Sequence, residues 1–371
     1  MSMSRHLFCA LALLLALPMS PAQAVNALWA NQATPQAAMV GDYRSLGCPY
    51  PAPEPYTGAL QFESKYDQSD VTKSRLSATP DVQAKKVQAQ VKGYIGGLIR
   101  ASKEFQRAKR PERANQALAC LDTWLGRWAH ARALENPDAS KTGIAARKWA
   151  LAAIGSTLLK VRALSDGRYE LDSEQKAWLE RLAERVITEY QPRHVPDFPY
   201  FNNHDYWAGW AVASVGMLVE REDFIAWADY SLRRGLAQAQ RSTSGDYAYL
   251  PLEVARGKLA STYTQYALVP LVLLVESAEA NGRPLSGDER QTLWLLASFA
   301  ARSQLEPEKL PELQAHDQDE VAPYKLAWLI PYLHRYPGHP WARRLYDEMG
   351  GDVDNYSQIG GPIKPMYPTQ D

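Results

Sequence analysis

The stretch LACLDTWLGRW at residues 118–128 decides the fold class of this chain. Its large apolar side chains recur at intervals of three and four residues, which places them on one face of an α-helix. They are Leu118, Leu121, Trp124, Leu125 and Trp128. A similar pattern, with apolar residues at intervals of four and five, runs from Val82 to Ile99. These two stretches predict amphipathic helices that each bury one face.

Further helical patterns follow along the rest of the chain. They cover residues 147–164, 173–190, 204–220, 223–240, 259–280, 288–302 and 324–335. Asp172 with Gln175 and Ser286 with Glu289 have the spacing of a capping box, which supports two of the helix starts. Alternating strand patterns are scarce, and no repeat of fixed period is present, which disfavours a TPR or HEAT array. The sequence therefore predicts an all-α fold of antiparallel helical hairpins, arranged as a bundle, a solenoid or an α/α toroid.

The first 24 residues form a separate segment. Arg5 precedes an apolar run at residues 7–17, and residues 22–24 (Ala-Gln-Ala) have the small-x-small form of a cleavage site. We therefore expect residues 1–24 to be a secretory signal peptide and residues 25–371 to form one domain that acts in the periplasm as a monomer. The apolar run is too short to span a membrane and no later run is long enough, so we expect no membrane anchor.

Between Val25 and about Pro80 the chain is rich in proline, which predicts an irregular, extended segment. Cys48 lies in this segment, and Cys120 lies in the helical stretch quoted above. Because Cys9 falls in the signal peptide, these two cysteines remain, and an even pair in an oxidising compartment suggests a disulfide. The loop that it closes is worth roughly 4 kcal/mol in chain entropy. The alternative is two buried free thiols.

Charge and composition limit the partners of the protein. Lys and Arg together number 41, as do Asp and Glu, so the formal net charge is zero. Non-specific nucleic-acid binding rests on many phosphate contacts, so we expect no nucleic-acid partner, and any anionic partner must meet a local basic cluster. The 20 Tyr and 11 Trp far outnumber the 7 Phe. Rings with a polar edge suit sugar-binding clefts, although they fill a helical core equally well.

The stretch FNNHDYW at residues 201–207 brings several functional side chains to an expected helix start. Free N–H groups at a helix N-terminus, together with the Asn203 amide and the His204 imidazole, are suited to hold an anionic group of a substrate. The simpler alternative is that Asn203 is only an N-cap and that His204 is an ordinary first-turn residue.

Arg256 and Tyr263 form a second candidate pair. If this stretch is helical, residues seven apart share a face. A guanidinium near a phenol favours the phenolate and lowers the phenol pKa, which would make Tyr263 a usable proton acceptor. The alternative is a solvated Arg256 and a core Tyr263. Residues 64–70 (SKYDQSD) have the composition of a surface loop.

Motifs for several other chemistries are missing from the sequence. There is no His-Glu-x-x-His, no Cys-x-x-Cys and no EF-hand loop, so we expect no metal. There is no Gly-x-Ser-x-Gly elbow and no phosphate-binding glycine loop, and we expect no cofactor. Asp197, Asp205 and Glu253 lie near the candidate residues in sequence, so a glycosidase with paired carboxylates stays open.

A series of motifs occurs in order between about residues 48 and 332. They are Cys-Pro…Pro-Tyr-Thr-Gly from Cys48 to Gly58, Ser-Lys-Tyr-x-x-Ser-Asp at 64–70, Arg-Lys-Trp-Ala-Leu at 147–151, Asn-Asn-His-x-Tyr-Trp at 202–207, Leu-Pro-x-Glu at 250–253, Arg256, Tyr263, Tyr-Ala-Leu at 266–268, and Ala-Trp-Leu-x-Pro-Tyr at 327–332. In these motifs and their spacing the chain resembles the family 5 polysaccharide lyases, the alginate lyases of alginate-producing bacteria.

The resemblance implies an incomplete α/α toroid with a deep cleft and a lid loop, and cleavage of polymannuronate by β-elimination to give 4,5-unsaturated uronate ends. It implies that Asn203, His204 and Arg256 neutralise the C6 carboxylate and stabilise the developing enolate. Tyr263 then removes the C5 proton and returns a proton to O4. Lys65 looks like a substrate contact on the lid loop. The matched motifs imply further substrate contacts, which are Tyr66, Arg147, Asn202, Tyr206, Trp207 and Tyr266.

The sequence also departs from the family pattern. Members commonly carry a denser basic run where this chain has Ala-Arg-Gly-Lys at 255–258, and a His-Asn-Tyr where it has Thr-Gln-Tyr at 264–266. The expected partner is an anionic polysaccharide, alginate or polymannuronate, but these departures leave open a lyase on another polyuronide such as glucuronan or hyaluronan. A toroidal glycosidase and a non-catalytic polymer-binding protein are the remaining alternatives.

Overall fold

The structure is a computed structural model that describes residues 24–30, 34–79 and 81–368. The expected signal peptide therefore lies outside the described residues, apart from Ala24. Eleven α-helices and one two-stranded antiparallel sheet are present in the described part of the chain. The helices are α1 (Val82–Arg107), α2 (Pro111–His130), α3 (Lys141–Leu164), α4 (Ser173–Tyr190), α5 (Asn203–Val219), α6 (Glu222–Ala237), α7 (Pro251–Val254), α8 (Ala260–Ala280), α9 (Gly287–Leu305), α10 (Leu329–Arg335) and α11 (Pro340–Glu348); the strands are β1 (Gln240–Arg241) and β2 (Ala248–Tyr249).

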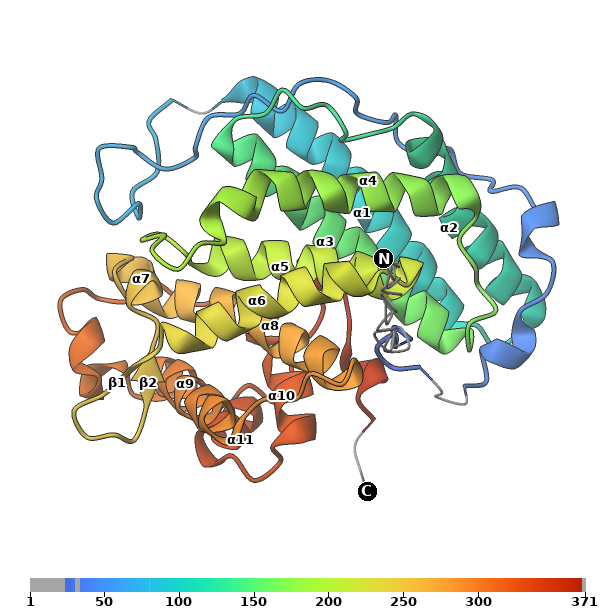
Figure 1. Ribbon diagram of the computed structural model, residues 1–371. Coiled ribbons are helices and arrows are strands. Elements are labelled where there is room, and N and C mark those ends of the chain that lie inside the picture. The colour runs from blue at the N-terminus through green and yellow to red at the C-terminus, as the bar shows by residue number, and fades with distance from the viewer. Residues whose placement is uncertain (1–23, 31–33, 80, 369–371) are drawn as a thin grey trace, which may run out of the picture.

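The long helices form antiparallel pairs, as the sequence predicts (Figure 1). The first helices of successive pairs contact one another in a row, α1 on α3, α3 on α5 and α5 on α8, while α2 packs on α4 and α6 packs on α9. Two concentric rows of helices joined in this way make an incomplete α/α toroid. The predicted fold class is confirmed.

Helix α5 lies at the centre of this arrangement. It contacts α3, α4, α6 and α8, and almost all of its residues from Asn203 to Leu218 are buried. A helix that is apolar all round belongs in a core. Helix α8 is the one helix in the described residues long and apolar enough to cross a membrane, and most of that apolar stretch is buried inside the molecule. The N-terminus of α5 and the start of α8 carry the residues that the sequence marks as functional.

Local sequence signals explain most helix limits. Both predicted capping boxes form, with Asp172 at the start of α4 and Ser286 at the start of α9. Helix α3 begins six residues earlier than its apolar pattern predicts, because Ser140 caps it and accepts a hydrogen bond from the Gly143 N–H. The sequence analysis missed α11, a nine-residue helix that starts at a proline after its N-cap, His339.

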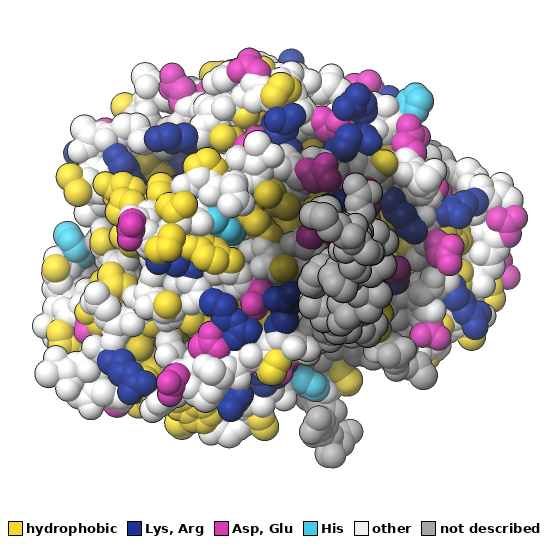
Figure 2. All heavy atoms as spheres, in the orientation of Figure 1, with side chains coloured by type: hydrophobic (Ala, Val, Ile, Leu, Met, Phe, Trp, Pro, Cys, Tyr) yellow, Lys and Arg dark blue, Asp and Glu magenta, His cyan; other side chains and the backbone are white. Residues whose placement is uncertain are grey.

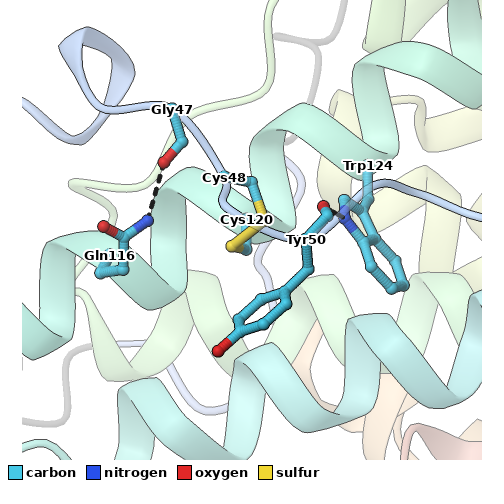
Figure 3. The surroundings of a disulfide bond; sticks show 6 residues. All are labelled: Gly47, Cys48, Tyr50, Gln116, Cys120 and Trp124. Carbon is cyan, nitrogen blue, oxygen red and sulfur yellow. Dashed lines mark hydrogen bonds between the residues drawn. A yellow bond between two sulfur atoms is a disulfide. The ribbon is translucent and has the colours of Figure 1, made fainter.

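One face of α2 holds the proline-rich N-terminal segment (Figure 3). The predicted disulfide between Cys48 and Cys120 is present, with the two Cα atoms 4.5 Å apart. One turn on either side, the Gln116 side chain donates a hydrogen bond to the Gly47 carbonyl (2.8 Å), and the Trp124 indole donates one to the Tyr50 carbonyl (2.9 Å). Donors at intervals of four residues line one helix face. These contacts hold the extended N-terminal segment in a fixed position along α2.

Candidate active site

The N-terminus of α5 is capped by Asn202, one residue before the predicted N-cap. The Asn202 side chain accepts a hydrogen bond from the His204 N–H, and Asp205 accepts one from the Asn202 N–H to complete a capping box. Asp205 is fully buried and is held by Arg193 in a two-pronged ion pair with N–O distances of 2.5 and 2.6 Å. Capping by Asn202 leaves the Asn203 side chain free for another role.

Asn203 is oriented by a buried carboxylate, that of Glu253 on α7. The Asn203 backbone N–H donates to Oε1 of Glu253 (2.7 Å), and the side-chain Nδ2 donates to Oε2 (2.8 Å). Burial raises the pKa of Glu253 to about 7, although both hydrogen bonds from Asn203 act to lower it. The Oδ1 atom of Asn203 is buried and has no hydrogen-bond partner in the described part of the chain. An unpaired acceptor of this kind is available to a ligand.

His204 lies against a buried lysine. Its Nδ1 atom is 2.8 Å from Nζ of Lys148, which in turn donates to the phenol oxygen of Tyr190 at 2.7 Å. The ring of Trp149 is 5.6 Å from the imidazole, centroid to centroid. Burial, followed by the nearby charges of Lys148, Arg193 and Arg256, holds the pKa of His204 well below its usual value. The imidazole is therefore neutral at physiological pH.

Arg256 and Tyr263 are brought together, although not on one continuous helix as the sequence analysis supposed. Arg256 precedes a short 3₁₀ turn at Gly257–Leu259, Tyr263 lies in the first turn of α8, and Cζ of Arg256 is 3.7 Å from the centroid of the Tyr263 ring. Burial raises the pKa of Tyr263, and the lowering effect of Arg256 is the smaller one. The expected influence of Arg256 is present, but the expected net lowering of the Tyr263 pKa is wrong because desolvation dominates.

A loop at residues 65–77 lies directly on this pair. Arg256 donates two hydrogen bonds of 2.8 Å to the loop carbonyls of Thr72 and Lys73, and the Tyr263 hydroxyl donates to that of Tyr66 (3.1 Å). Gly257 adopts a left-handed φ of 58° beneath the loop, and a Cβ there would lie 3.3 Å from Thr72. The loop at residues 65–77 therefore covers Arg256 and Tyr263 in this structure.

Within the loop, Tyr66 has an unusual environment for a tyrosine. Burial acts to raise its pKa, but the hydrogen bond from Tyr263 and the nearby charge of Lys65 outweigh it, and the Tyr66 pKa is lowered. Nζ of Lys65 is 4.8 Å from the centre of the Tyr66 ring. The loop therefore adds a second phenol and a cation to the site.

Four cations around these phenols and His204 form no salt bridge with the described residues; they are Lys65, Lys148, Arg256 and Lys325. Arg193, which lies near the same site, differs from them because it forms an ion pair with Asp205. Burial and the like charge of Lys65 lower the pKa of Lys325, which Tyr66 acts to raise, so Lys325 lies within electrostatic reach of both. In Figure 2, hydrophobic side chains with a few basic ones among them gather on the left of the face that it shows, near the position of α7 in Figure 1.

Three of the predicted substrate contacts, Arg147, Tyr206 and Trp207, are buried and contact other parts of the protein, so this structure does not expose them to a ligand. Arg147 donates to the carbonyls of Leu134 and Asn136 and pairs with Glu189. Tyr206 donates to Gln238, and the Trp207 ring packs on that of Tyr266 at 5.2 Å. These side chains pack beneath the candidate site and hold its surrounding segments in place.

The remaining predicted contacts have mixed positions. Lys65 is exposed and Tyr66 is partly buried on the loop, Asn202 is occupied as the N-cap, and the partly buried Tyr266 accepts a hydrogen bond from Gln358 (2.8 Å). Residues that the sequence analysis missed are Lys148, Lys325 and the orienting role of Glu253. Lys148 belongs to the motif Arg-Lys-Trp-Ala-Leu at 147–151, so the sequence carried a signal, but the sequence analysis assigned the substrate contact to the neighbouring Arg147.

The carboxylates considered for a glycosidase do not form an accessible pair. Asp205 is locked to Arg193 and Glu253 to Asn203, both in buried positions, while Asp197 is exposed. In the described residues no group of three or more His, Cys, Asp or Glu side chains is placed to hold a metal ion.

Amide, imidazole, phenol and cationic side chains lie together on this toroid, and the comparisons with known proteins place the chain among the polysaccharide lyases. The family comparison makes the assignment more specific: residues 61–310 match the model of the family described as alginate lyase, and this chain belongs to that family. An alginate lyase of Pseudomonas putida is 32% identical over 85% of this chain and 83% of its own length, and one of Pseudomonas aeruginosa is 30% identical over 95% and 96%.

Solved structures support the fold. Alginate lyase A1-III from Sphingomonas species A1 matches with a TM-score of 0.65 at 17% identity, and the match covers 92% of each chain. A variant of the same enzyme complexed with a tetrasaccharide matches with a TM-score of 0.66. At this identity the likeness establishes the toroid alone.

Proposed function

We propose that the protein cleaves the 1,4 linkage of polymannuronate by β-elimination and leaves a 4,5-unsaturated uronate end. The observation that carries the proposal is the set of unpaired cations around Tyr263 and His204. A polyuronide offers one carboxylate per sugar, and a protein with zero net charge attracts it only where basic groups lack internal partners. Family membership supports the same reaction class.

The C5 proton of a uronate is too weakly acidic to be removed while the C6 carboxylate keeps its full charge. In the proposed mechanism His204, Arg256 and the second N–H of the Asn203 side-chain amide donate hydrogen bonds to that carboxylate and stabilise the enolate that forms. His204, being neutral, acts as a hydrogen-bond donor. Arg256 supplies the positive charge once the loop at residues 65–77 moves and releases its N–H groups.

Tyr263 acts as base and then as acid. In β-mannuronate the C5 proton and the leaving O4 lie on the same side of the sugar, so one phenol serves both steps. The phenolate needed for the first step is disfavoured by burial and favoured by Arg256, which is stacked on the ring. The proton taken from C5 is returned to O4 as the bond between C4 and O4 breaks.

The expected setting is the periplasm, after cleavage of residues 1–24, and the active form is a monomer without metal. The decisive assay follows the ultraviolet absorbance of the conjugated 4,5-unsaturated product, which hydrolysis does not create. Polymannuronate, polyguluronate, glucuronan and hyaluronan are compared at equal uronate concentration. We expect the highest kcat/KM on polymannuronate. Reducing ends without absorbance would indicate a glycosidase, and binding without either product would indicate a non-catalytic polymer-binding protein.

A further inference from the structure

A buried lysine behind the site has no carboxylate partner. Lys148 is fully buried in α3, and in the described part of the chain it forms no salt bridge. Its Nζ contacts the phenol oxygen of Tyr190 (2.7 Å) and Nδ1 of His204 (2.8 Å). The aromatic faces of Trp149 and Tyr190 lie 4.9 and 5.0 Å from Nζ and stabilise its charge. Burying an ammonium is costly, so this position calls for a reason.

The hydrogen-bonding rules of the two groups restrict the imidazole. Burial lowers the pKa of Lys148, and the nearby charge of Asp205 acts against this. In its ammonium form the lysine has three donors and no acceptor, so Nδ1 of His204 accepts its hydrogen bond. A neutral imidazole that accepts at Nδ1 carries its proton on Nε2. Nε2 of His204 makes no hydrogen bond to a described residue, and the side chain is only partly buried. The Nε2–H group of the His204 imidazole is therefore available to a ligand.

We propose that Lys148 is a positioning residue that holds His204 in the Nε2–H tautomer, so that His204 donates a hydrogen bond to the substrate carboxylate and cannot act as a base. The kinetic part of this inference rests on the proposed function, whereas the tautomer does not. With Nε2 protonated and Nδ1 engaged by Lys148, His204 has no free lone pair for the C5 proton. The base must then be another group, which agrees with Tyr263.

The first test reads the tautomer in the unmodified protein. The ¹⁵N resonances of histidine-labelled mature protein report which ring nitrogen carries the proton, and His204→Gln identifies the relevant signals by their loss. We expect the proton of His204 on Nε2. A proton on Nδ1 in the wild-type protein overturns the inference, whatever the variants do.

The second test removes the donor. Lys148→Met keeps a similar side-chain length without an N–H group. We expect the Nδ1–H tautomer to become populated and kcat on polymannuronate to fall at least about tenfold, as wrong-tautomer variants of catalytic histidines do, with a smaller change in KM. Unchanged tautomer populations, or an unchanged kcat alongside a changed tautomer, refute the positioning role.

A matched control lies on the same helix. Lys160 is also fully buried in α3, but it donates to the backbone carbonyls of Gly360 and Pro362. Lys160→Met loses a buried ammonium without touching His204, and we expect it to keep the wild-type tautomer and kcat. Should Lys148→Met fail to fold, the wild-type spectrum still decides the inference. Should the wild-type protein cleave no uronan, the proposed function fails while the spectrum still decides the role of Lys148.

Discussion

Replacing Tyr263 by Phe removes one oxygen atom, and the structure limits what else changes. Among the described residues, the phenol oxygen donates a hydrogen bond of 3.1 Å to Tyr66. The ring stays in place, with Arg256 stacked on it at 3.7 Å. The lost hydrogen bond is worth about 1 kcal/mol, so we expect Tm to fall by at most about 4 °C.

The loss of activity should be far larger than the loss of stability. If the phenol carries the proton in both steps, its removal eliminates a general acid–base contribution that is typically about 10²–10⁴-fold. We expect the initial rate of absorbance increase on polymannuronate to fall by at least about 10²-fold. Polymer affinity, measured by calorimetry, should change little because the ring and the cations remain.

Two other tyrosines serve as controls. Tyr94→Phe removes a buried hydroxyl that has no partner in the described residues, and it should leave the rate unchanged. Tyr66→Phe breaks the same hydrogen bond from the loop side but keeps the Tyr263 oxygen, so its loss should be smaller than that of Tyr263→Phe. A rate above about a tenth of wild type for Tyr263→Phe would refute the assignment of Tyr263 as the base.

Four further outcomes are expected. Because the folded pKa of Glu253 is raised from 4.5 to about 7, its contribution to stability is complete below about pH 4.5 and is lost as pH rises through 7; the Tm of wild type minus that of Glu253→Gln should fall over this range. Replacing Cys48 and Cys120 by Ala should lower the free energy of unfolding in urea by up to about 4 kcal/mol, and no change would contradict a bond in the purified protein. Lys65→Ala should raise KM and lower kcat on long polymer without changing Tm, whereas unchanged kinetics would remove Lys65 from the site. Chelator should leave activity intact, and a loss restored by added metal would disprove metal independence.

The fold was predictable because its signals are local. The three- and four-residue spacing of apolar side chains marked most of the long helices, and the caps at Asp172 and Ser286 fixed two starts. The predicted helix boundaries were wrong where a capping residue precedes the apolar pattern, as Ser140 does for α3. Helix α11 was not predicted because it is short and buries little more than Ala342 and Leu345.

The site was predictable only in part, because its decisive contacts join segments far apart in the chain. Asn203, His204, Arg256 and Tyr263 stood in motifs. Lys148 stood in one too, but one step along a helix turns a side chain by about 100°, and only the fold shows that it faces His204 while Arg147 does not.

In the described part of the chain, the cations at the site form hydrogen bonds only to uncharged groups, which explains how a protein of zero net charge keeps a positively charged site. Arg256 binds two backbone carbonyls, and Lys148 binds a phenol and an imidazole. A carboxylate in these places, like the Asp205 that holds Arg193, would cancel the charge. In the proposed mechanism a polymer carboxylate competes with the loop carbonyls for Arg256, because it accepts two parallel N–H bonds from the guanidinium and brings the opposite charge, which neutral carbonyls do not. In this mechanism binding of the polymer and opening of the loop are coupled, because both involve the guanidinium of Arg256, which contacts the loop and Tyr263 in the present structure.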